Sequence, residues 1–267
     1  MRLSQQNVSY SREEKELDIR SPSLVPLITY PHFSESAYND RIIEMESIGI
    51  TSIILGGKTI VNGAHIAGKG CVGIVVKSKV GSKVCALKIR RTDADRTTMN
   101  AEAHFLKIAN SIGVGPHLEW QTRNLIAMEY INGESIIDWI LCNRNNYYYY
   151  YSETTKRKMR TVTRSILEQC FSLDGASLDH GELSRLARHV IVSDRPYIID
   201  FESASTKRKT SNVTAAAQSI FLYGLVADGV RKILDSIDSE KAVKALRNYK
   251  HFQTRANFDA VLDSLSI

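Results

Sequence analysis

Features that mark several other classes of protein are scarce in this chain. Its 267 residues hold only four cysteines, none of them in a C-x-x-C pair: Cys71, Cys85, Cys142 and Cys170. This spacing argues against a disulfide framework and against a cysteine zinc site, so we expect free thiols, with Cys71 and Cys85 buried in strands. Long apolar runs are absent too, because no segment carries the roughly eighteen consecutive apolar residues that a membrane span needs.

The first twenty residues are polar and charged and do not resemble a secretory signal peptide. We therefore expect a cytoplasmic protein without membrane contact. The apolar fraction of 43% and the charged fraction of 24% are ordinary for a soluble globular protein that can bury a substantial core. A net charge of +6 suits an anionic ligand or partner, a description that fits ATP, RNA and an acidic protein equally well.

The strongest positive signal is a glycine-rich run, Gly68-Lys69-Gly70-Cys71-Val72-Gly73-Ile74-Val75. In dinucleotide-binding proteins such a run opens a helix, but here it leads into β-branched residues that favour a strand. The run therefore predicts the tip of an antiparallel hairpin, where glycines let backbone N–H groups approach an anion closely. A tight turn is the simpler interpretation of the glycines alone. Lys88, in the predicted next strand V-C-A-L-K, favours a phosphate site.

Weaker signals precede this run. Residues 1 to about 22 lack apolar periodicity, which predicts a loosely docked arm. Residues 34–47 read as a helix, followed by strands at 50–55 and 58–61 and a hairpin turn at Asn62-Gly63. The apolar residues of the predicted helix lie near one side: Ile42, Ile43 and Met45. A helix followed by a hairpin also resembles the end of a winged-helix unit, which is a second interpretation of this region.

A further helix is predicted over residues 93–112, with Gly113 as its stop. Glu102 lies on the apolar face of this helix. The simpler interpretation is a glutamate at the edge of an apolar stripe. A carboxylate turned inward needs a cation, however, and Lys88 on the preceding strand is the natural partner.

The chain beyond this helix reads as mainly helical. A buried strand at 124–130 ends at a polar break, Ile131-Asn132-Gly133, which could join two lobes. Helical patterns then cover three stretches, the last with two or three helices: 134–142, 153–171 and 211–267. Five consecutive tyrosines, Tyr147–Tyr151, read either as a stacking platform for nucleic acid or as an exposed loop. Because no alternating pattern of cations runs through them, the loop is favoured.

Two segments carry the candidate catalytic chemistry. The first, Leu178-Asp179-His180-Gly181-Glu182-Leu183-Ser184-Arg185, is followed by an apolar strand at 190–192. The second, Tyr197-Ile198-Ile199-Asp200-Phe201-Glu202, places Asp200 at the end of another apolar strand. A carboxylate in that position is costly unless a metal or a cation occupies the site, so Asp200 is a candidate magnesium ligand.

Together these pieces resemble the protein-kinase-like superfamily over roughly residues 58 to 235. The matching pieces are the glycine-rich loop 68–75, Lys88, Glu102, the hinge-like Met128-Glu129-Tyr130, the H-G-E-L loop 180–183 and the I-D-F segment 199–201. The histidine-glycine-acid loop is similar to that of the RIO family of atypical kinases and their small archaeal relatives. No A-P-E sequence follows Asp200, and the run 208–214 resembles a group of predicted archaeal Ser/Thr protein kinases near that family.

The resemblance implies an α+β, two-lobed protein-kinase-like fold. It consists of a small antiparallel N-lobe sheet with one helix and a compact, mainly helical C-lobe. The expected boundaries are 1–55 for an N-terminal extension with a helix and the start of the sheet, 56–131 for the N-lobe and 132–267 for the C-lobe.

The resemblance also implies ATP-dependent transfer of a phosphoryl group, with Mg²⁺ or Mn²⁺, to Ser/Thr hydroxyls of a protein substrate or of the chain itself. Such transfer depends mainly on positioning and on neutralisation of charge. Glu182 would orient the acceptor hydroxyl and accept its proton, and Asp200 would bind the metal. Arg185 would steady the phosphoryl group or form a surface salt bridge. Lys88, held by Glu102, would contact the phosphates. The implied nucleotide-binding positions are Gly68, Lys69, Gly70, Gly73, Val75, Ala86, Lys88, Glu102, Met128, Glu129 and Tyr130.

Three positions depart from the family pattern. The catalytic aspartate is replaced by Glu182, one methylene longer, and the expected metal-binding asparagine by Ala187. If the loop is two residues longer, His189 takes the place of the asparagine, where it could bind manganese or a softer ion, hold a phosphate or brace the loop. Glu202 stands where most kinases have glycine and adds a carboxylate, so the expected metal ligands are Asp200, His189 and Glu202.

Two other functions are compatible with these residues. Phosphotransferases that act on aminoglycosides, sugars or lipid-linked glycans carry similar H-G-acid and I-D-F-E sequences, although the complete glycine hairpin is a protein-kinase trait. Glu182 and His189 instead suggest a nucleotide-binding switch with weak activity, which the retention of Lys88, Glu102 and Asp200 disfavours. The RIO resemblance also suggests contact of the basic surface with RNA or ribosomal particles.

Overall fold

The structure, a computed structural model, describes residues 14–143, 151–234 and 237–267. The chain divides into two compact units, which we describe separately. Unit 1 comprises Met1–Asn100 and Glu119–Tyr130, and unit 2 comprises Ala101–Leu118 and Ile131–Ile267. Antiparallel strands and separate helices place the protein in the α+β class, as predicted.

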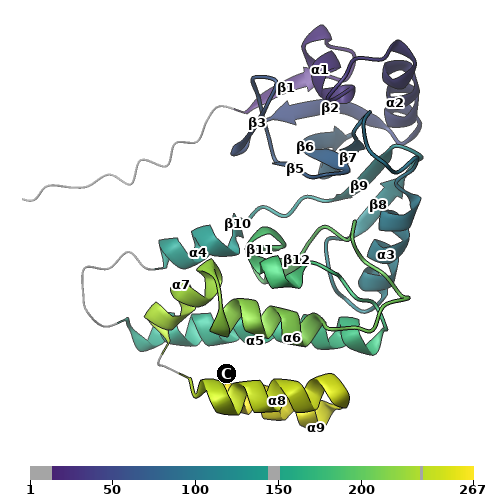
Figure 1. The fold of residues 1–267 in the computed structure, drawn as a ribbon. Coiled ribbons are helices and arrows are strands. Elements are labelled where there is room, and N and C mark those ends of the chain that lie inside the picture. Colours follow the sequence, from purple (N-terminus) through teal and green to yellow (C-terminus); the bar gives the residue numbers. More distant parts are fainter. Residues whose placement is uncertain (1–13, 144–150, 235–236) are drawn as a thin grey trace, which may run out of the picture. The chain divides into compact units, whose positions relative to one another are not determined.

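Unit 1 is built on a seven-stranded sheet with the order β1-β2-β6-β7-β9-β8, and β5 pairs with β6 (Figure 1). Its strands are β1 (Lys15–Asp18), β2 (Ile50–Leu55), β5 (Gly68–Lys69), β6 (Gly73–Val80), β7 (Lys83–Arg90), β8 (Leu118–Gln121), whose first residue lies in unit 2, and β9 (Leu125–Glu129). The pairings β1–β2, β2–β6, β5–β6, β6–β7 and β7–β9 are all antiparallel. Because β2 belongs to this larger sheet, the structure does not support the winged-helix interpretation.

A second, two-stranded sheet confirms the predicted hairpin at Asn62-Gly63. It joins β3 (Thr59–Val61) to β4 (Ala64–Ile66). Both turn residues have positive φ, 48° for Asn62 and 79° for Gly63, as a two-residue turn matched to the strand twist requires.

Three short helical elements precede β2: η1 (Pro22–Leu24), α1 (Val25–Ile28) and α2 (Glu35–Ser47). Ser34 caps α2 by accepting a hydrogen bond from the N–H of Ala37 at 3.3 Å. Apolar side chains of these elements and of the sheet form one core: Leu24, Leu27, Ile28, Ile42, Met45, Ile53, Ile74, Val76 and Leu87. The prediction for Ile43 was wrong, because this side chain is 64% exposed.

Arg41 is buried on α2, a position that the pattern of apolar residues did not predict for a charged side chain. Its guanidinium donates to the carbonyl of Ile28 at 2.8 Å and to that of Arg90 at 2.5 Å. Burial lowers the pKa of Arg41 to about 10, so the group stays charged at neutral pH. Two nitrogens of the guanidinium therefore find main-chain carbonyls, which tie the N-terminal segment to β7, while its buried Nε atom has no hydrogen-bond partner among the described residues.

The predicted arm is wrong for residues 15–18, which form β1 at the edge of the sheet; residues 1–13 lie outside the described residues. Glu16 helps to hold this strand on the sheet, because it pairs with Lys79 at 2.5 Å and accepts a hydrogen bond from the hydroxyl of Ser52 at 2.6 Å. Strand β1 is mostly exposed and held by polar contacts, so its sequence lacks an apolar alternation.

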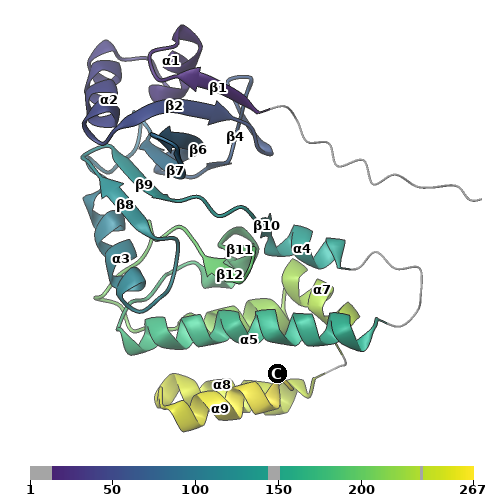
Figure 2. The same ribbon diagram turned by 180° about the vertical axis from the view of Figure 1, so that it is seen from behind.

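Unit 2 combines a three-stranded antiparallel sheet with helices. The strands are β10 (Glu134–Ser135), β11 (Val190–Val192) and β12 (Pro196–Ile198). The helices are α3 (Asn100–Ser111), whose first residue lies in unit 1, α4 (Ile136–Cys142), α5 (Glu153–Gly175), η2 (Leu183–Arg188), α6 (Asn212–Ala217), η3 (Gln218–Leu222), α7 (Leu225–Ile233), α8 (Ser239–His251) and α9 (Arg255–Ser264). Figures 1 and 2 show α8 and α9 side by side, with α5 between them and β11–β12.

Several predicted boundaries in unit 2 need correction. Helix α3 begins at Asn100 rather than at residue 93, because the preceding residues form turns in which Arg91 pairs with Asp93 at 2.7 Å. The described residues between 211 and 267 hold four α-helices and the π-helical η3, more than predicted. Of the five tyrosines, only Tyr151 lies within the described residues.

No single helix within the described residues is long and apolar enough to cross a membrane. The consecutive segments Asn212–Leu222 and Leu225–Ile233 meet the length and composition criteria only when taken as one pair, and a 60° bend separates them.

Candidate functional site

The glycine-rich run forms a hairpin in unit 1, as predicted. Strand β5 pairs antiparallel with β6, with Gly68 opposite Val75. At the tip, the N–H of Gly70 donates to the carbonyl of Gly73 at 2.7 Å. A Cβ atom at Gly73 would lie 2.9 Å from the carbonyl oxygen of Ile89, so this position requires glycine.

The predicted nucleotide-binding residues of unit 1 lie on the strands beside this hairpin. Lys88 is opposite Val75 on β7 and is only 3% exposed. Ala86, two residues earlier on the same strand, is opposite Met128 of β9. The other two predicted positions end β9 or follow it: Glu129 and Tyr130.

Arg91 and Tyr30, which were not predicted as site residues, lie beside the hairpin tip. The side chain of Arg91 donates to the carbonyl of Gly70 at 3.3 Å, and its guanidinium lies 5.3 Å from the centre of the Tyr30 ring. The ammonium of Lys69 lies 4.9 Å from the same ring. Cys71 is exposed at this tip, so its predicted burial in a strand was wrong; Cys85 is buried in β7, as predicted.

In unit 2, the loop His180-Gly181-Glu182 is anchored by hydrogen bonds to its backbone. The N–H of His180 donates to the side-chain oxygen of Asn212 at 2.9 Å. The amide nitrogen of that Asn212 side chain donates to Asp174 at 2.8 Å and to the carbonyl of Leu178 at 2.8 Å. Asp174 also accepts from the hydroxyl of Tyr249 at 2.9 Å. These buried groups join α5, α6 and α8 behind the loop.

The glycine of this loop has a structural reason. Gly181 has φ +88°, a conformation that side chains other than glycine rarely adopt. A Cβ atom there would lie 2.8 Å from the carbonyl oxygen of Ser203 and would collide with the guanidinium of Arg208. Arg208 needs this space because it donates to that carbonyl at 2.5 Å and to the carboxylate of Asp179 at 2.9 Å.

His189 lies close to two of the predicted acidic residues, Glu182 and Asp200. Its Nε2 atom lies 3.2 Å from a carboxylate oxygen of Glu182, and its Nδ1 atom lies 4.0 Å from a carboxylate oxygen of Asp200. Asp200 has φ +70°, which is uncommon outside glycine and marks a backbone held in place by its surroundings. Arg185 lies exposed on η2, where its own backbone interrupts the helix.

Three carboxylates of unit 2 form a candidate metal centre. One oxygen from each of Glu102, Asp200 and Glu202 lies within 4.8 Å of the others, and Glu102 and Glu202 are buried. Like charges so close together are stabilised by a cation, and oxygen ligands suit Mg²⁺ or Mn²⁺. The burial predicted for Glu102 is confirmed. Asp200 and Glu202 belong to the predicted set of metal ligands, and Glu102 joins them in this cluster. The third predicted ligand, His189, is not part of the cluster and lies between Glu182 and Asp200.

Two groups at the loop have shifted pKa values. The hydroxyl of Ser203 donates to Glu182 at 2.5 Å, and this hydrogen bond is the main reason that the pKa of Glu182 is lowered. His180 is fully buried against Phe201, with its Nε2 atom 3.0 Å from the carbonyl of Ile199. Burial lowers its pKa to about 4, so His180 is neutral at pH 7.

This shift predicts an acid-dependent loss of stability. Between pH 6.5 and about pH 4 the unfolded chain binds a proton at His180 that the folded chain does not, so stability present above pH 6.5 is lost as the pH falls. The contribution is on the order of 3 kcal/mol. Chemical unfolding in the presence of a chelator at pH 7 and pH 4.5 measures it. His180→Asn should be less stable at pH 7 but lose less on acidification; an equal loss in both proteins would contradict the assignment.

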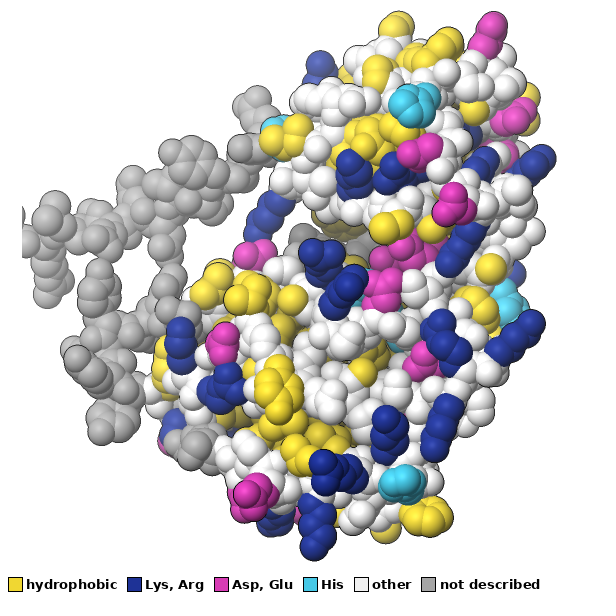
Figure 3. Space-filling model, viewed as in Figure 1, with side chains coloured by type: hydrophobic (Ala, Val, Ile, Leu, Met, Phe, Trp, Pro, Cys, Tyr) yellow, Lys and Arg dark blue, Asp and Glu magenta, His cyan; other side chains and the backbone are white. Residues whose placement is uncertain are grey.

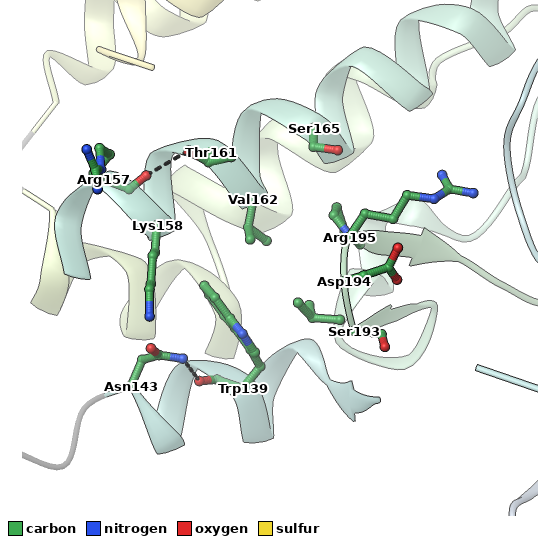
Figure 4. Close-up of a pocket in the computed structure, with 12 residues that line it drawn as sticks. Trp139, Asn143, Arg157, Lys158, Thr161, Val162, Ser165, Ser193, Asp194 and Arg195 are labelled. Atoms are coloured by element: carbon green, nitrogen blue, oxygen red, sulfur yellow. Dashed lines mark hydrogen bonds between the residues drawn. The ribbon is translucent and has the colours of Figure 1, made fainter. Parts of the chain in front are cut away.

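A pocket of about 420 Å³ lies elsewhere in unit 2, among α4, α5 and the β11–β12 turn (Figure 4). Lys158 of α5 and Trp139 of α4 point into the space between the two helices. None of the predicted site residues lines this pocket. Over α5 to α9 in Figure 3, Lys and Arg side chains are dispersed among acidic and uncharged ones rather than gathered in one stripe.

Comparison with known proteins finds a distant sequence relative but does not assign a family. No family model matches the chain. The uncharacterized protein MJ1211 of Methanocaldococcus jannaschii is 28% identical over 125 residues, which cover 46% of this chain and 98% of that protein.

Proposed function

We propose that this protein transfers the γ-phosphoryl group of ATP to a Ser/Thr hydroxyl, as a compact kinase of RIO-like, two-lobed architecture. The observation that carries the proposal is the grouping of Glu182, His189 and Asp200 within unit 2. Glu182 and His189 flank the short helix η2, Asp200 follows β12, and Asp200 also joins a cluster of three carboxylates. This combination supplies a base for the acceptor hydroxyl and a ligand for the metal ion, and phosphoryl transfer requires both groups.

The glycine hairpin of unit 1 provides the second support. Its tip has the backbone freedom to present N–H groups to an anion, and Lys88 follows on the adjacent strand in register with Val75. In the proposal, the hairpin and Lys88 bind the phosphates of ATP. Glu182 orients the acceptor hydroxyl and receives its proton.

The three carboxylates fit a divalent cation, because a hard ion prefers oxygen ligands and offsets their mutual repulsion. Glu102, Asp200 and Glu202 would hold Mg²⁺ or Mn²⁺, which would supply neutralisation of phosphate charge. Each ring nitrogen of His189 lies within 4.0 Å of a carboxylate oxygen, one of Glu182 and one of Asp200, so the imidazole would stand beside the bound ion.

Replacing Lys88 tests the proposal. Lys88→Ala should lower ATP-dependent phosphoryl transfer by about 10²-fold, because the phosphates lose a fixed cation. Lys83→Ala is the matched control, since Lys83 is an exposed lysine of the same strand that pairs with Glu119. Formation of ADP and transfer of label from γ-labelled ATP are measured with Mg²⁺ and with Mn²⁺. Equal rates for Lys88→Ala and the wild type would remove the kinase proposal, and label found only on sugars or aminoglycosides would change the acceptor class.

A further inference from the structure

One hydroxyl of this chain already occupies the contact that an acceptor hydroxyl would make. Ser203 lies three residues after Asp200, and its Oγ atom donates to Oε1 of Glu182 at 2.5 Å. Both residues belong to unit 2. A hydrogen bond from a hydroxyl to a carboxylate is charge-assisted and directional, so the Ser203 hydroxyl proton is aimed at the proposed base.

The surroundings of Ser203 hold this contact in place. The second oxygen of Glu182 lies 3.2 Å from Nε2 of His189, so the carboxylate stands between the Ser203 hydroxyl and an imidazole. The carbonyl of Ser203 accepts from Arg208 at 2.5 Å, and the missing side chain at Gly181 lets that carbonyl approach the loop.

Ser203 is also accessible to a second reactant. Its side chain is only partly buried, and the side chain of Glu182 is 28% exposed. A hydroxyl that served only to complete a packed core would be closed off from solvent. Access on one side and a base on the other are the requirements for an acceptor.

We propose that Ser203 is a phosphoryl acceptor and that this chain phosphorylates itself there. The inference rests on the proposed kinase function. In the step, Oγ of Ser203 forms a bond to the γ-phosphorus of ATP while the bond from that phosphorus to the β–γ bridging oxygen breaks. ADP leaves with the electron pair of the broken bond. The hydroxyl proton passes to the carboxylate of Glu182 and then to solvent.

The reaction limits itself. A phosphoserine carries a charge of about −1.5 to −2 at pH 7, and here it would stand beside the carboxylate of Glu182. The guanidinium of Arg208, about half exposed next to the Ser203 backbone, can pair with the new charge. The phosphoryl group would therefore stay on Ser203 and cover the base. We expect at most one phosphoryl group per chain at this position and slower transfer to other acceptors once it is present.

The test uses the full chain incubated with ATP and either Mg²⁺ or Mn²⁺. Peptide mass spectrometry locates the phosphoryl group, and ADP formation is measured in the same samples. We expect phosphorylation of Ser203 approaching one group per chain, at a rate per chain that is independent of protein concentration. Ser203→Ala should lose this incorporation. Ser203→Thr should instead carry phosphothreonine at position 203, a change that a purely structural hydroxyl would not produce.

Ser205→Ala is the matched control. Ser205 lies on the same segment, and its hydroxyl accepts from the N–H of Lys207 rather than contacting Glu182, so incorporation should equal that of the wild type. Lys88-dependent ADP formation with no phosphoryl group on Ser203 would overturn the inference and leave the kinase function standing. Absence of ADP formation with both metals would overturn both proposals. Loss of ADP formation in Ser203→Ala, with an unmodified Ser203 in the wild type, would reduce Ser203 to a residue that positions Glu182.

Discussion

Asp200→Asn is expected to lower metal-dependent phosphoryl transfer by about 10²–10³-fold, the range found when one preorganised electrostatic group is removed from an active site. The substitution removes one of the three charges in the cluster that Asp200 forms with Glu102 and Glu202. Asparagine is the suitable replacement, because it tolerates the left-handed backbone that Asp200 adopts at φ +70°. The loss should therefore come from charge and not from misfolding.

The same variant should not be less stable in the absence of metal. Three carboxylates with oxygens within 4.8 Å of one another repel, so removing one charge should leave the free energy of unfolding unchanged or raise it by up to about 1 kcal/mol. Calorimetric titration with Mn²⁺ measures the affinity for the metal, and chemical unfolding in a chelator measures the free energy of unfolding without it. Asp194→Asn, in the exposed β11–β12 turn, is the control and should bind Mn²⁺ as the wild type does. Wild-type affinity for Mn²⁺ in Asp200→Asn would remove the metal centre.

Asp174→Ala is expected to lower the free energy of unfolding by about 3–5 kcal/mol, because several buried donors lose their acceptor at about 1–3 kcal/mol each. Asp174 is 5% exposed and accepts from Tyr249, from both nitrogens of Asn212 and from the N–H of Val213. Alanine would leave these donors in the core without an acceptor.

Two further variants separate this network from burial in general. Tyr249→Phe removes one donor and leaves no orphan on the ring, so it should cost only about 1 kcal/mol. Asp259→Ala breaks an exposed pair with Arg255 on one helix and should cost less than about 0.5 kcal/mol. Urea unfolding gives all three values. A cost for Asp174→Ala near that of Asp259→Ala would show that the network does not support the loop of His180.

Local patterns allowed the hairpins and the loop His180-Gly181-Glu182 to be predicted. The Asn62-Gly63 turn and the glycine hairpin follow from backbone conformations that few other residues adopt, so neighbours in the sequence were sufficient. The apolar strands before Asp200 and after His189 were visible because each is a short run of buried residues. That Glu182, His189 and Asp200 lie close together was predicted from the family resemblance and not from their spacing in the sequence.

Contacts between distant residues could not be predicted. Asp174 meets Asn212 and Tyr249 across 38 and 75 residues, and nothing in the local sequence of either partner indicates this pairing. Strand β1 was missed because it is held by charged partners on other strands. The exposed position of Ile43 and the buried position of Arg41 reversed the expectation from hydrophobicity, because two nitrogens of the Arg41 guanidinium donate to main-chain carbonyls inside the core.

The pairing of β2 with β6 determines where the chain can be shortened. Strand β6 has β2 on one side and β7 on the other, so it offers no free row of backbone donors and acceptors along this stretch. A chain starting at residue 56 would bare that row over Lys77–Val80 and would also remove Ile50 and Ile53 from the apolar interior. Such an edge is a template for intermolecular strand addition, so truncation at this boundary should yield aggregates instead of a folded fragment.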